Sequence, residues 1–243
     1  DPIYKIKDSV DLFLSDEKFL IAHYMNTRQR KSFRINKWTI HLLETIDGEK
    51  RLSRLQAIMN ESFHVLPEDT FSVIEMMRKN RIITQKIENE LILFEHDRSR
   101  YDRQINYFAE FFGEEKEGLL AQKRIMESNI LIFGCGAVGG DIAEELVMAG
   151  VQNITLFDFD KVEESDASRH MYYEAGTEGE YKTEALKRKL QRIDNRVNVS
   201  CINESMRPES NIEALIILAD FVINTLDEPY IGYTSSKISR ICI

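Results

Sequence analysis

The sequence predicts an α/β domain built on a parallel sheet, preceded by a small α+β domain. The α/β domain is predicted by a chain of three local patterns. The apolar run Ile130–Phe133 leads into the glycine-rich stretch Gly134–Gly139, which opens an amphipathic helical pattern. A second apolar run, Ile154–Phe157, then ends in two acidic residues. Strands that alternate with helices in this way favour parallel pairing.

The glycine-rich stretch has the spacing of a nucleotide-binding loop. Gly134 permits a tight turn, Gly136 lets the backbone approach a phosphate, and Gly139 lets helix and strand pack closely. The helix that follows offers unpaired N–H groups and a partial positive charge to phosphates. Asp160, or Asp158 as the alternative, can accept the hydroxyl groups of a ribose. The sequence therefore predicts a Rossmann-like nucleotide site.

Motifs on both sides of the loop indicate which nucleotide is bound. Upstream lies Arg100-Tyr-Asp-Arg103-Gln104, and downstream lie Ser165–His170, Gly179–Glu184 and Ala219–Asp227. Taken together in this order, they resemble the ubiquitin-activating superfamily, which includes the adenylating enzymes of thiamine, molybdopterin and microcin biosynthesis. The resemblance extends from about residue 98 to the last residue. It implies a domain that uses ATP and Mg²⁺ to adenylate a carboxylate.

The resemblance assigns a role to five charged residues. Arg169 and Lys182 match the cations that touch the phosphates from their own subunit, and Asp227 matches the magnesium-binding aspartate. Asp160 matches the acid that binds the ribose. Arg103 matches an arginine that reaches into the neighbouring subunit's site, which implies a homodimer. Because a carboxylate that attacks a phosphate brings two anions together, a site with these cations suits the reaction.

The sequence departs from the family pattern close to these residues. Asp166 and Ser168 stand where the family usually has asparagines, and Glu228 follows Asp227 where the family usually has another asparagine. The charged residues are kept, so we expect catalysis to be intact. Family members often hold a structural zinc with two CxxC pairs, which would lie beyond residue 243. Family adenylation domains continue for roughly a hundred residues more, so the sequence predicts a domain that is incomplete at its C-terminus.

Residues 1–95 predict a separate, winged-helix-like domain. Three strand-like runs come first, with a turn over Asn26–Lys31: Val10–Leu14, Phe19–Met25 and Ser32–Ile35. Three helical patterns follow: Lys37–Ile46, Leu52–Phe63 and Glu68–Lys79. The runs Ile82–Ile87 and Leu91–Phe94 then predict a hairpin, the wing.

Charge argues against nucleic acid as the ligand of this domain. Residues 1–95 contain fifteen Lys and Arg and fifteen Asp and Glu, whereas DNA-binding domains carry a basic excess. The architecture resembles instead the precursor-peptide recognition element of enzymes that modify ribosomally made peptides. The resemblance implies that a leader peptide docks as an added strand between the third strand and the third helix. The implied contacts are Lys31, Phe33, Arg34, Ile35, Phe71, Ile74 and Arg78.

The predicted organisation has three parts: the recognition domain at 1–95, a linker with the arginine motif at 96–123 and the adenylation domain at 124–243. Cys135, Cys201 and Cys242 show no pairing pattern, which suits a reducing compartment. The sequence contains no signal peptide and no apolar run of membrane-spanning length. We therefore expect a cytoplasmic enzyme with no nucleic-acid or membrane partner.

The most specific prediction is a homodimeric, ATP-dependent enzyme that clamps a ribosomal precursor peptide and adenylates one of its carboxylates, in peptide antibiotic biosynthesis. Three alternatives stay open. The first is adenylation of a ubiquitin-like sulfur-carrier protein in thiamine or molybdopterin synthesis. The second is an NAD-dependent oxidoreductase, which leaves Arg103, Arg169 and Lys182 without a role. The third is a non-catalytic module that presents peptides to another enzyme.

Overall fold

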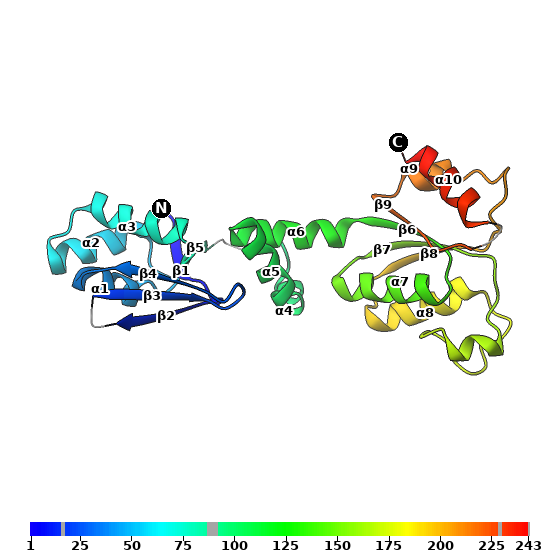
Figure 1. Cartoon of the computed structure of the whole chain (residues 1–243), viewed down its shortest axis with the longest axis horizontal. Helices are drawn as coiled ribbons and strands as arrows, with labels where there is room; N and C mark the ends of the chain where they lie inside the picture. Colours follow the sequence, from blue (N-terminus) through cyan, green and yellow to red (C-terminus); the bar gives the residue numbers. More distant parts are fainter. Residues whose placement is uncertain (16–17, 87–91, 228–229, 243) are drawn as a thin grey trace. The chain divides into compact units, whose positions relative to one another are not determined.

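The computed structural model of the chain describes residues 1–15, 18–86, 92–227 and 230–242. They form two compact units, Asp1–Leu120 and Ala121–Ile243, each with its own hydrophobic core (Figure 1). The division falls inside the segment that the sequence predicts as a linker. Every helix in the described part of the chain is too short or too polar to span a bilayer.

A three-stranded antiparallel meander lies in the N-terminal unit. It consists of β2 (Val10–Ser15), β3 (Phe19–Tyr24) and β4 (Gln29–Arg34), in that order across the sheet. Along β3, Leu20 and Ala22 are buried and their neighbours are less so, the alternation of a strand with one face on the core. β4 is an edge strand with mostly exposed residues. It begins earlier than predicted, because it takes up part of the expected turn.

The strand β1 (Ile3–Ile6), which the sequence did not predict, pairs antiparallel with β5 (Ile83–Lys86). The predicted wing, a hairpin of Ile82–Ile87 with Leu91–Phe94, is therefore wrong about the partner of its first strand. Residues 87–91 lie outside the described residues, and residues 92–94 contain no strand. A partner this distant in the sequence leaves no trace in the local pattern, because alternation fixes a strand's faces but not its neighbour.

Three helices complete the core of this unit: α1 (Lys37–Thr45), α2 (Leu52–Phe63) and α3 (Pro67–Lys79). Their ends lie within one residue of the predicted ends. Asn36 caps α1, since its side chain accepts the N–H of Thr39 at 3.1 Å. The buried faces of the helices and the inner face of the meander share one apolar cluster (Figure 1).

The predicted linker is helical. It contains α4 (Glu95–Arg100), α5 (Asp102–Phe112) and the start of α6 (Glu115–Glu127). Gly118 allows α6 to approach α5 closely, because a Cβ at this position would lie 2.4 Å from the carbonyl oxygen of Ile105. The residues of the arginine motif are therefore held on a helix that packs within the N-terminal unit.

The C-terminal unit is built on a parallel sheet, which confirms the predicted α/β fold class. Its strands are β6 (Asn129–Phe133), β7 (Asn153–Phe157), β8 (Asn198–Ile202) and β9 (Phe221–Asn224). They lie in the order β8-β7-β6-β9. The chain adds β7 and β8 on one side of β6 and then returns to add β9 on the other side, so the strand order reverses between β6 and β9. Ligands of open α/β sheets bind beyond the carboxyl ends of the strands at such a reversal.

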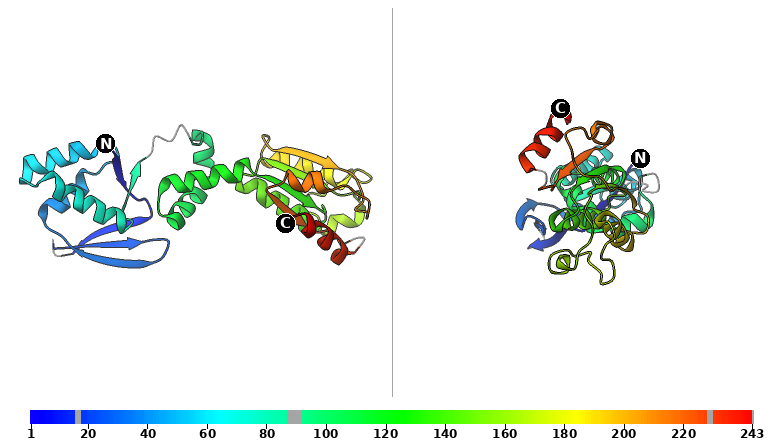
Figure 2. Two further views of the ribbon diagram at one scale, coloured as in Figure 1. Left: turned by 90° about the horizontal axis from the view of Figure 1, so that it is seen from above. Right: turned by 90° about the vertical axis from the view of Figure 1, so that its right-hand side faces the viewer.

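Helices cover both faces of this sheet (Figure 1, Figure 2). One face carries α7 (Ala137–Ala149) and α8 (Lys182–Ile193), and the other carries α9 (Glu213–Ile217) and α10 (Ile231–Ile241). The side chains of β6 alternate between the two cores, with Ile132 in one and Phe133 in the other. A strand buried on both faces reads as a continuous apolar run, which is why its sequence predicted it so clearly.

Candidate functional site

The glycine-rich loop joins β6 to α7 at the carboxyl end of the parallel sheet. Gly134 adopts a φ of 93°, in the left-handed region that favours glycine. A Cβ on Gly134 would also lie 2.6 Å from Oγ1 of Thr225, in the segment after β9. A Cβ on Gly139 would lie 2.0 Å from the carbonyl oxygen of Gly134. Both glycines are therefore required by the packing of the protein itself.

Gly136 has a different role, because no atom lies within 4 Å of the position that its Cβ would take. It is the N-cap residue of α7, and no side chain caps this helix. The first N–H groups of α7 therefore face open space, where the helix dipole favours an anion. A phosphate needs this combination of free donors and close access to the main chain, so the loop fits a phosphate group.

Asp158 ties the loop to the end of β7. Its carboxylate accepts the N–H of Cys135 at 2.6 Å and the N–H of Asp160 at 2.8 Å, and the residue is 5% exposed. Burial raises the pKa of this carboxyl group, although the two N–H donors act in the opposite direction. Asp158 is thus occupied by the main chain. The half-exposed Asp160 is the acid at this strand end with surface left for a ligand.

Lys182, the first residue of α8, is paired with Asp160. Its Nζ lies 3.0 Å from Oδ2 of Asp160, and its main-chain N–H donates to the carbonyl oxygen of the same residue at 2.9 Å. Lys182 is buried, and burying an ammonium group is costly unless it is paired. The pair therefore fixes one cation and one acid side by side at the ends of β7 and α8.

Arg169 is anchored by a buried carboxylate. It follows a short 3₁₀ helix (Glu164–Ser168), and its guanidinium donates to Oδ1 of Asp166 at 2.9 Å. Asp166 is 1% exposed and also accepts the N–H of Glu163 at 2.9 Å. Burial acts to raise the pKa of Asp166, but the Glu163 N–H and the charges of Lys182 and Arg169 outweigh it and hold the pKa below its ordinary value. The aspartate that replaces the family's asparagine thus orients an arginine.

His170 lies against the same carboxylate. Its Nδ1 is 3.5 Å from Oδ1 of Asp166 and has no hydrogen-bond partner among the described residues. Its ring stacks on Tyr172 with 5.2 Å between the ring centroids, and the Tyr172 hydroxyl donates to the carbonyl oxygen of Cys135 in the glycine loop. Burial lowers the pKa of His170, while the charge of Asp166 acts to raise it. The two rings connect the segment of Arg169 with the loop.

These segments enclose a cavity of about 380 Å³ at the reversal point of the sheet. Its lining contains every residue that the sequence assigned to nucleotide, phosphate or magnesium within this unit: Gly134, Gly136, Gly139, Asp160, Arg169, Lys182 and Asp227. Asp227 is exposed, directly after β9. Within the described ranges no three His, Cys, Asp or Glu side chains are grouped to hold a metal ion. Asp227 therefore fits a cation that phosphate oxygens also hold, as Mg²⁺ is usually held.

Comparison with known proteins places the chain in a family. Residues 101–243 match the sequence model of the ThiF family. The chain belongs to the ThiF family. Among curated relatives, the SUMO-activating enzyme subunit 1 of Xenopus laevis is 29% identical over 122 residues, which are 50% of this chain and 33% of the relative. The molybdopterin-synthase adenylyltransferase of Escherichia coli is 31% identical over 135 residues, 56% of this chain and 51% of the relative. The chain thus matches only a third to a half of the length of these relatives.

Solved structures share the fold. The crystal structure of selenomethionyl PaaA matches with a TM-score of 0.71 at 21% identity, covering 96% of this chain and 68% of that one. The E. coli MccB structure with ATP matches with a TM-score of 0.62 at 18% identity, covering 98% of this chain and 66% of that one. Because these matches cover nearly the whole chain, they include the N-terminal unit, which lies largely outside the ThiF match.

Arg103 is not part of the cavity that contains the other ThiF-family residues. It is exposed on α5 and lines a separate cavity of the N-terminal unit. Its action on a neighbouring subunit stays a prediction.

The four contacts expected on the third strand lie on or just after β4. Lys31 and Arg34 are exposed, while Phe33 and Ile35 are half-buried and pack on the core. Nζ of Lys31 lies 3.4 Å from Oδ1 of Asn80, at the end of α3, so β4 and this end of α3 lie close together.

The three contacts expected on α3 have different environments. Phe71 is 44% exposed and available to a ligand. Ile74 is 0% exposed and belongs to the core, so the peptide contact that the resemblance implied there is corrected. The helical spacing of apolar residues had already indicated a buried face at this position. Arg78 is held by Glu75 at 3.0 Å and by Glu114 at 2.8 Å.

Thr225 is a site residue that the sequence analysis missed. Its hydroxyl lies 3.0 Å from the carbonyl oxygens of both Phe133 and Gly134. Its main-chain N–H donates to the carbonyl oxygen of Phe133 at 2.7 Å. It thereby fixes the start of the glycine loop against the end of β9. The apolar run before Asp227 drew attention to this segment, but the contact depends on the pairing of β6 with β9, which sequence alone does not give.

Proposed function

We propose that the chain binds ATP and Mg²⁺ in the 380 Å³ cavity and adenylates a carboxylate of a ribosomally made precursor peptide. The observation that carries the proposal is the lining of this cavity. The free N–H groups of α7 face the same opening as two cations, Arg169 and Lys182, and one exposed acid, Asp227. Membership of the ThiF family supports adenylation as the reaction.

The geometry accounts for the demands of the reaction. A carboxylate oxygen bonds to the α-phosphorus of ATP, and the bond from that phosphorus to the pyrophosphate oxygen breaks. The α7 N–H groups donate to phosphate oxygens, and Lys182 and Arg169 offset the charge that attacking and leaving groups bring together. Asp160 accepts the ribose hydroxyls. Mg²⁺, when bound at Asp227, adds positive charge to the phosphates.

The N-terminal unit is the proposed peptide clamp. β4 pairs with β3 on one side, so its other edge can accept an added strand. Phe33 and Phe71 supply apolar surface for alternate side chains of such a strand. The likeness of the fold to MccB supports this assignment, since one MccB structure, of the microcin C7 biosynthetic enzyme, holds N-formylated MccA. In the same proposal the enzyme is a homodimer, and Arg103 serves the partner's cavity.

The test is ATP–pyrophosphate exchange with and without a short candidate precursor peptide. Asp227→Asn keeps size and removes charge, so exchange should be abolished while the unfolding temperature stays unchanged. Asp141→Asn is the matched control, because Asp141 is an exposed aspartate of α7 outside the cavity. Normal exchange by Asp227→Asn would sink the mechanism. Tight peptide binding without any exchange would instead favour a module that presents peptides.

A second candidate is adenylation of a sulfur-carrier protein, which the 31% identity to a molybdopterin-synthase adenylyltransferase favours. It uses the same cavity and differs in the acceptor. Exchange that depends on a ubiquitin-like carrier and not on the peptide, followed by formation of a thiocarboxylate, would identify it.

A further inference from the structure

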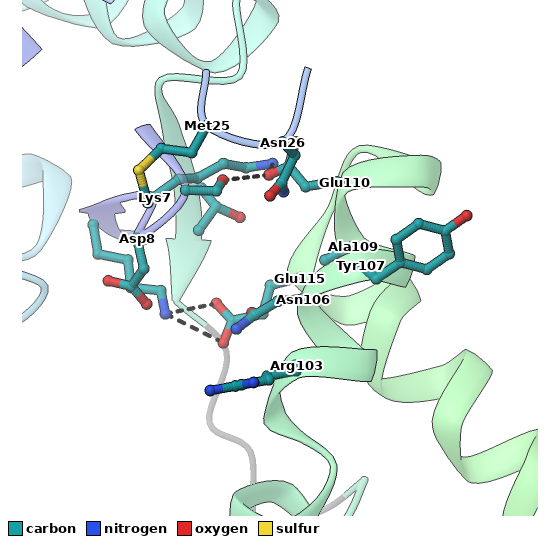
Figure 3. A pocket seen from close by; sticks show the side chains of 13 residues that line it. Lys7, Asp8, Met25, Asn26, Arg103, Asn106, Tyr107, Ala109, Glu110 and Glu115 are labelled. Atoms are coloured by element: carbon teal, nitrogen blue, oxygen red, sulfur yellow. Dashed lines mark hydrogen bonds and ion pairs between the residues drawn. The ribbon is translucent and has the colours of Figure 1, made fainter. Parts of the chain in front are cut away.

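A second and larger cavity, of about 550 Å³, lies wholly within the N-terminal unit. Figure 3 shows Lys7 and Asp8 on one side of it, Met25 and Asn26 above, and the α5 residue Arg103 below. Its volume is typical of sites that bind small molecules or peptide side chains. No residue of the proposed strand-docking groove lines it.

Thr84, on β5, lines this cavity with an unused hydroxyl group. The residue is 3% exposed, and its Oγ1 has no hydrogen-bond partner among the described residues. A buried polar group left without a partner costs about 1–3 kcal/mol, and folded proteins satisfy nearly all such groups. An occupant that hydrogen-bonds to Thr84 would remove this cost, so the cavity fits a polar ligand.

A smaller cavity, of about 230 Å³, lies beside the larger one. Its walls include Gln29 and Lys31 of β4 and Asn80 at the end of α3. The two cavities share the wall residues Ser9, Asn26 and Glu110, and the Ser9 hydroxyl donates to Glu110 at 2.7 Å. The smaller cavity therefore adjoins both the first residues of β4 and the larger cavity.

The direction of β4 determines which part of a docked peptide would meet this surface. β4 runs from Gln29 to Arg34, and an added antiparallel strand, which continues the meander, runs from the Arg34 end to the Gln29 end. The C-terminal continuation of that strand leaves β4 at the smaller cavity. We infer that the part of the peptide C-terminal to the docked strand passes through the smaller cavity and occupies the larger one. This inference rests on the proposed peptide clamp.

The charges of the larger cavity define the chemistry of this segment. Three cations and three acids line it, so their formal charges cancel: Lys5, Lys7, Arg103, Asp8, Glu110 and Glu115. Lys7 is paired with Glu110 at 3.0 Å, and Lys5 with Glu115 at 3.4 Å. A strongly charged segment would meet lining charges of both signs in equal number, whereas main-chain amides and small polar side chains pair with Thr84 and leave the two ion pairs intact. The site therefore favours an uncharged, hydrogen-bonding stretch.

Fluorescence anisotropy with two labelled peptides tests the inference. One is the full candidate precursor peptide that supports ATP–pyrophosphate exchange, and the other is the same peptide truncated after its docking strand. Thr84→Val preserves shape and removes the unused hydroxyl. It should weaken binding of the full peptide about 2- to 10-fold, the effect of one hydrogen bond, and leave binding of the truncated peptide unchanged. Asn26→Ala, at an exposed residue shared by both cavities, should act in the same direction.

Thr45→Val is the matched control. The Thr45 hydroxyl donates to the carbonyl oxygen of His41 within α1 at 2.6 Å, and Thr45 lines neither cavity. It should leave both affinities unchanged. The inference is overturned if Thr84→Val and Asn26→Ala weaken both peptides equally, or weaken neither; the clamp itself then stands, since the truncated peptide still binds. A wild-type chain that binds neither peptide would overturn the clamp, and the inference with it.

Discussion

Lys182 and Asp160, which the sequence assigned to the phosphates and the ribose of ATP, are bonded to each other at 3.0 Å. Each satisfies the other's charge before a nucleotide arrives. Nucleotide binding must therefore replace the Lys182–Asp160 ion pair by one contact of Lys182 with a phosphate and one contact of Asp160 with the ribose. The pair also holds the buried ammonium group beside the free N–H groups of α7, so that the cation needs little rearrangement to meet a phosphate.

Replacing this cation should abolish activity with little effect on folding. We expect Lys182→Gln to lower ATP–pyrophosphate exchange by about 100-fold or more, because a fixed charge aimed at the phosphates is lost. Thermal unfolding should change little, since Asp160 is half-exposed and stays solvated. Lys187→Gln is the control, because Lys187 lies on the same helix and outside the cavity. Equal losses in both variants would indicate damage to α8 instead of a lost charge.

Gly136→Ala should separate nucleotide binding from stability. The added methyl group meets no protein atom within 4 Å, and the φ of −70° suits any residue. We therefore expect an unfolding free energy within about 0.5 kcal/mol of the wild type. The methyl group would occupy the space through which a phosphate approaches the main chain, so ATP affinity, measured by calorimetry, should fall at least about tenfold. Unchanged affinity would place the phosphates elsewhere.

Two other glycines test whether Thr225 holds the loop. Gly134 and Gly176 have similar φ values, 93° and 91°, but only the first has a close neighbour at its Cβ position. In urea unfolding, Gly176→Ala should lose about 1–2 kcal/mol from backbone strain alone. Gly134→Ala should lose more, because of the clash with Thr225, and adding Thr225→Ala should recover part of the difference. Equal losses for the two glycines would mean that the segment after β9 yields freely.

The parts of the site that the sequence predicted are those defined by local spacing. The glycine loop, Asp160 and the apolar run of β6 each reflect requirements met within a few residues of chain. Arg169 and Lys182 came from a family pattern in which their positions are fixed relative to the strands. The glycines of the loop, Asp160, Arg169 and Lys182 do line one cavity.

The features of the site and the fold that the sequence did not predict depend on which strands are neighbours in a sheet. Thr225 acts only because β9 lies beside β6, and β5 pairs with a strand at the start of the chain. The spacing of α3 indicated that Ile74 is buried, and only the resemblance implied a peptide contact there, which its complete burial contradicts. The sequence favoured Asp160 over Asp158 for the ribose, but the hydrogen bonds that occupy Asp158 depend on the folded loop and could not be predicted.

Buried His170 should make stability depend on pH. Burial lowers its pKa in the folded chain, against the influence of Asp166, whereas the unfolded chain binds the proton near pH 6.5. Below that value the unfolded chain therefore binds more protons, and stability falls as the pH drops towards the folded pKa. His170→Gln cannot be protonated. Between about pH 7.5 and about pH 5.5, its unfolding free energy in urea should fall less than that of the wild type. An equal fall would show that folding leaves the protonation of His170 unchanged.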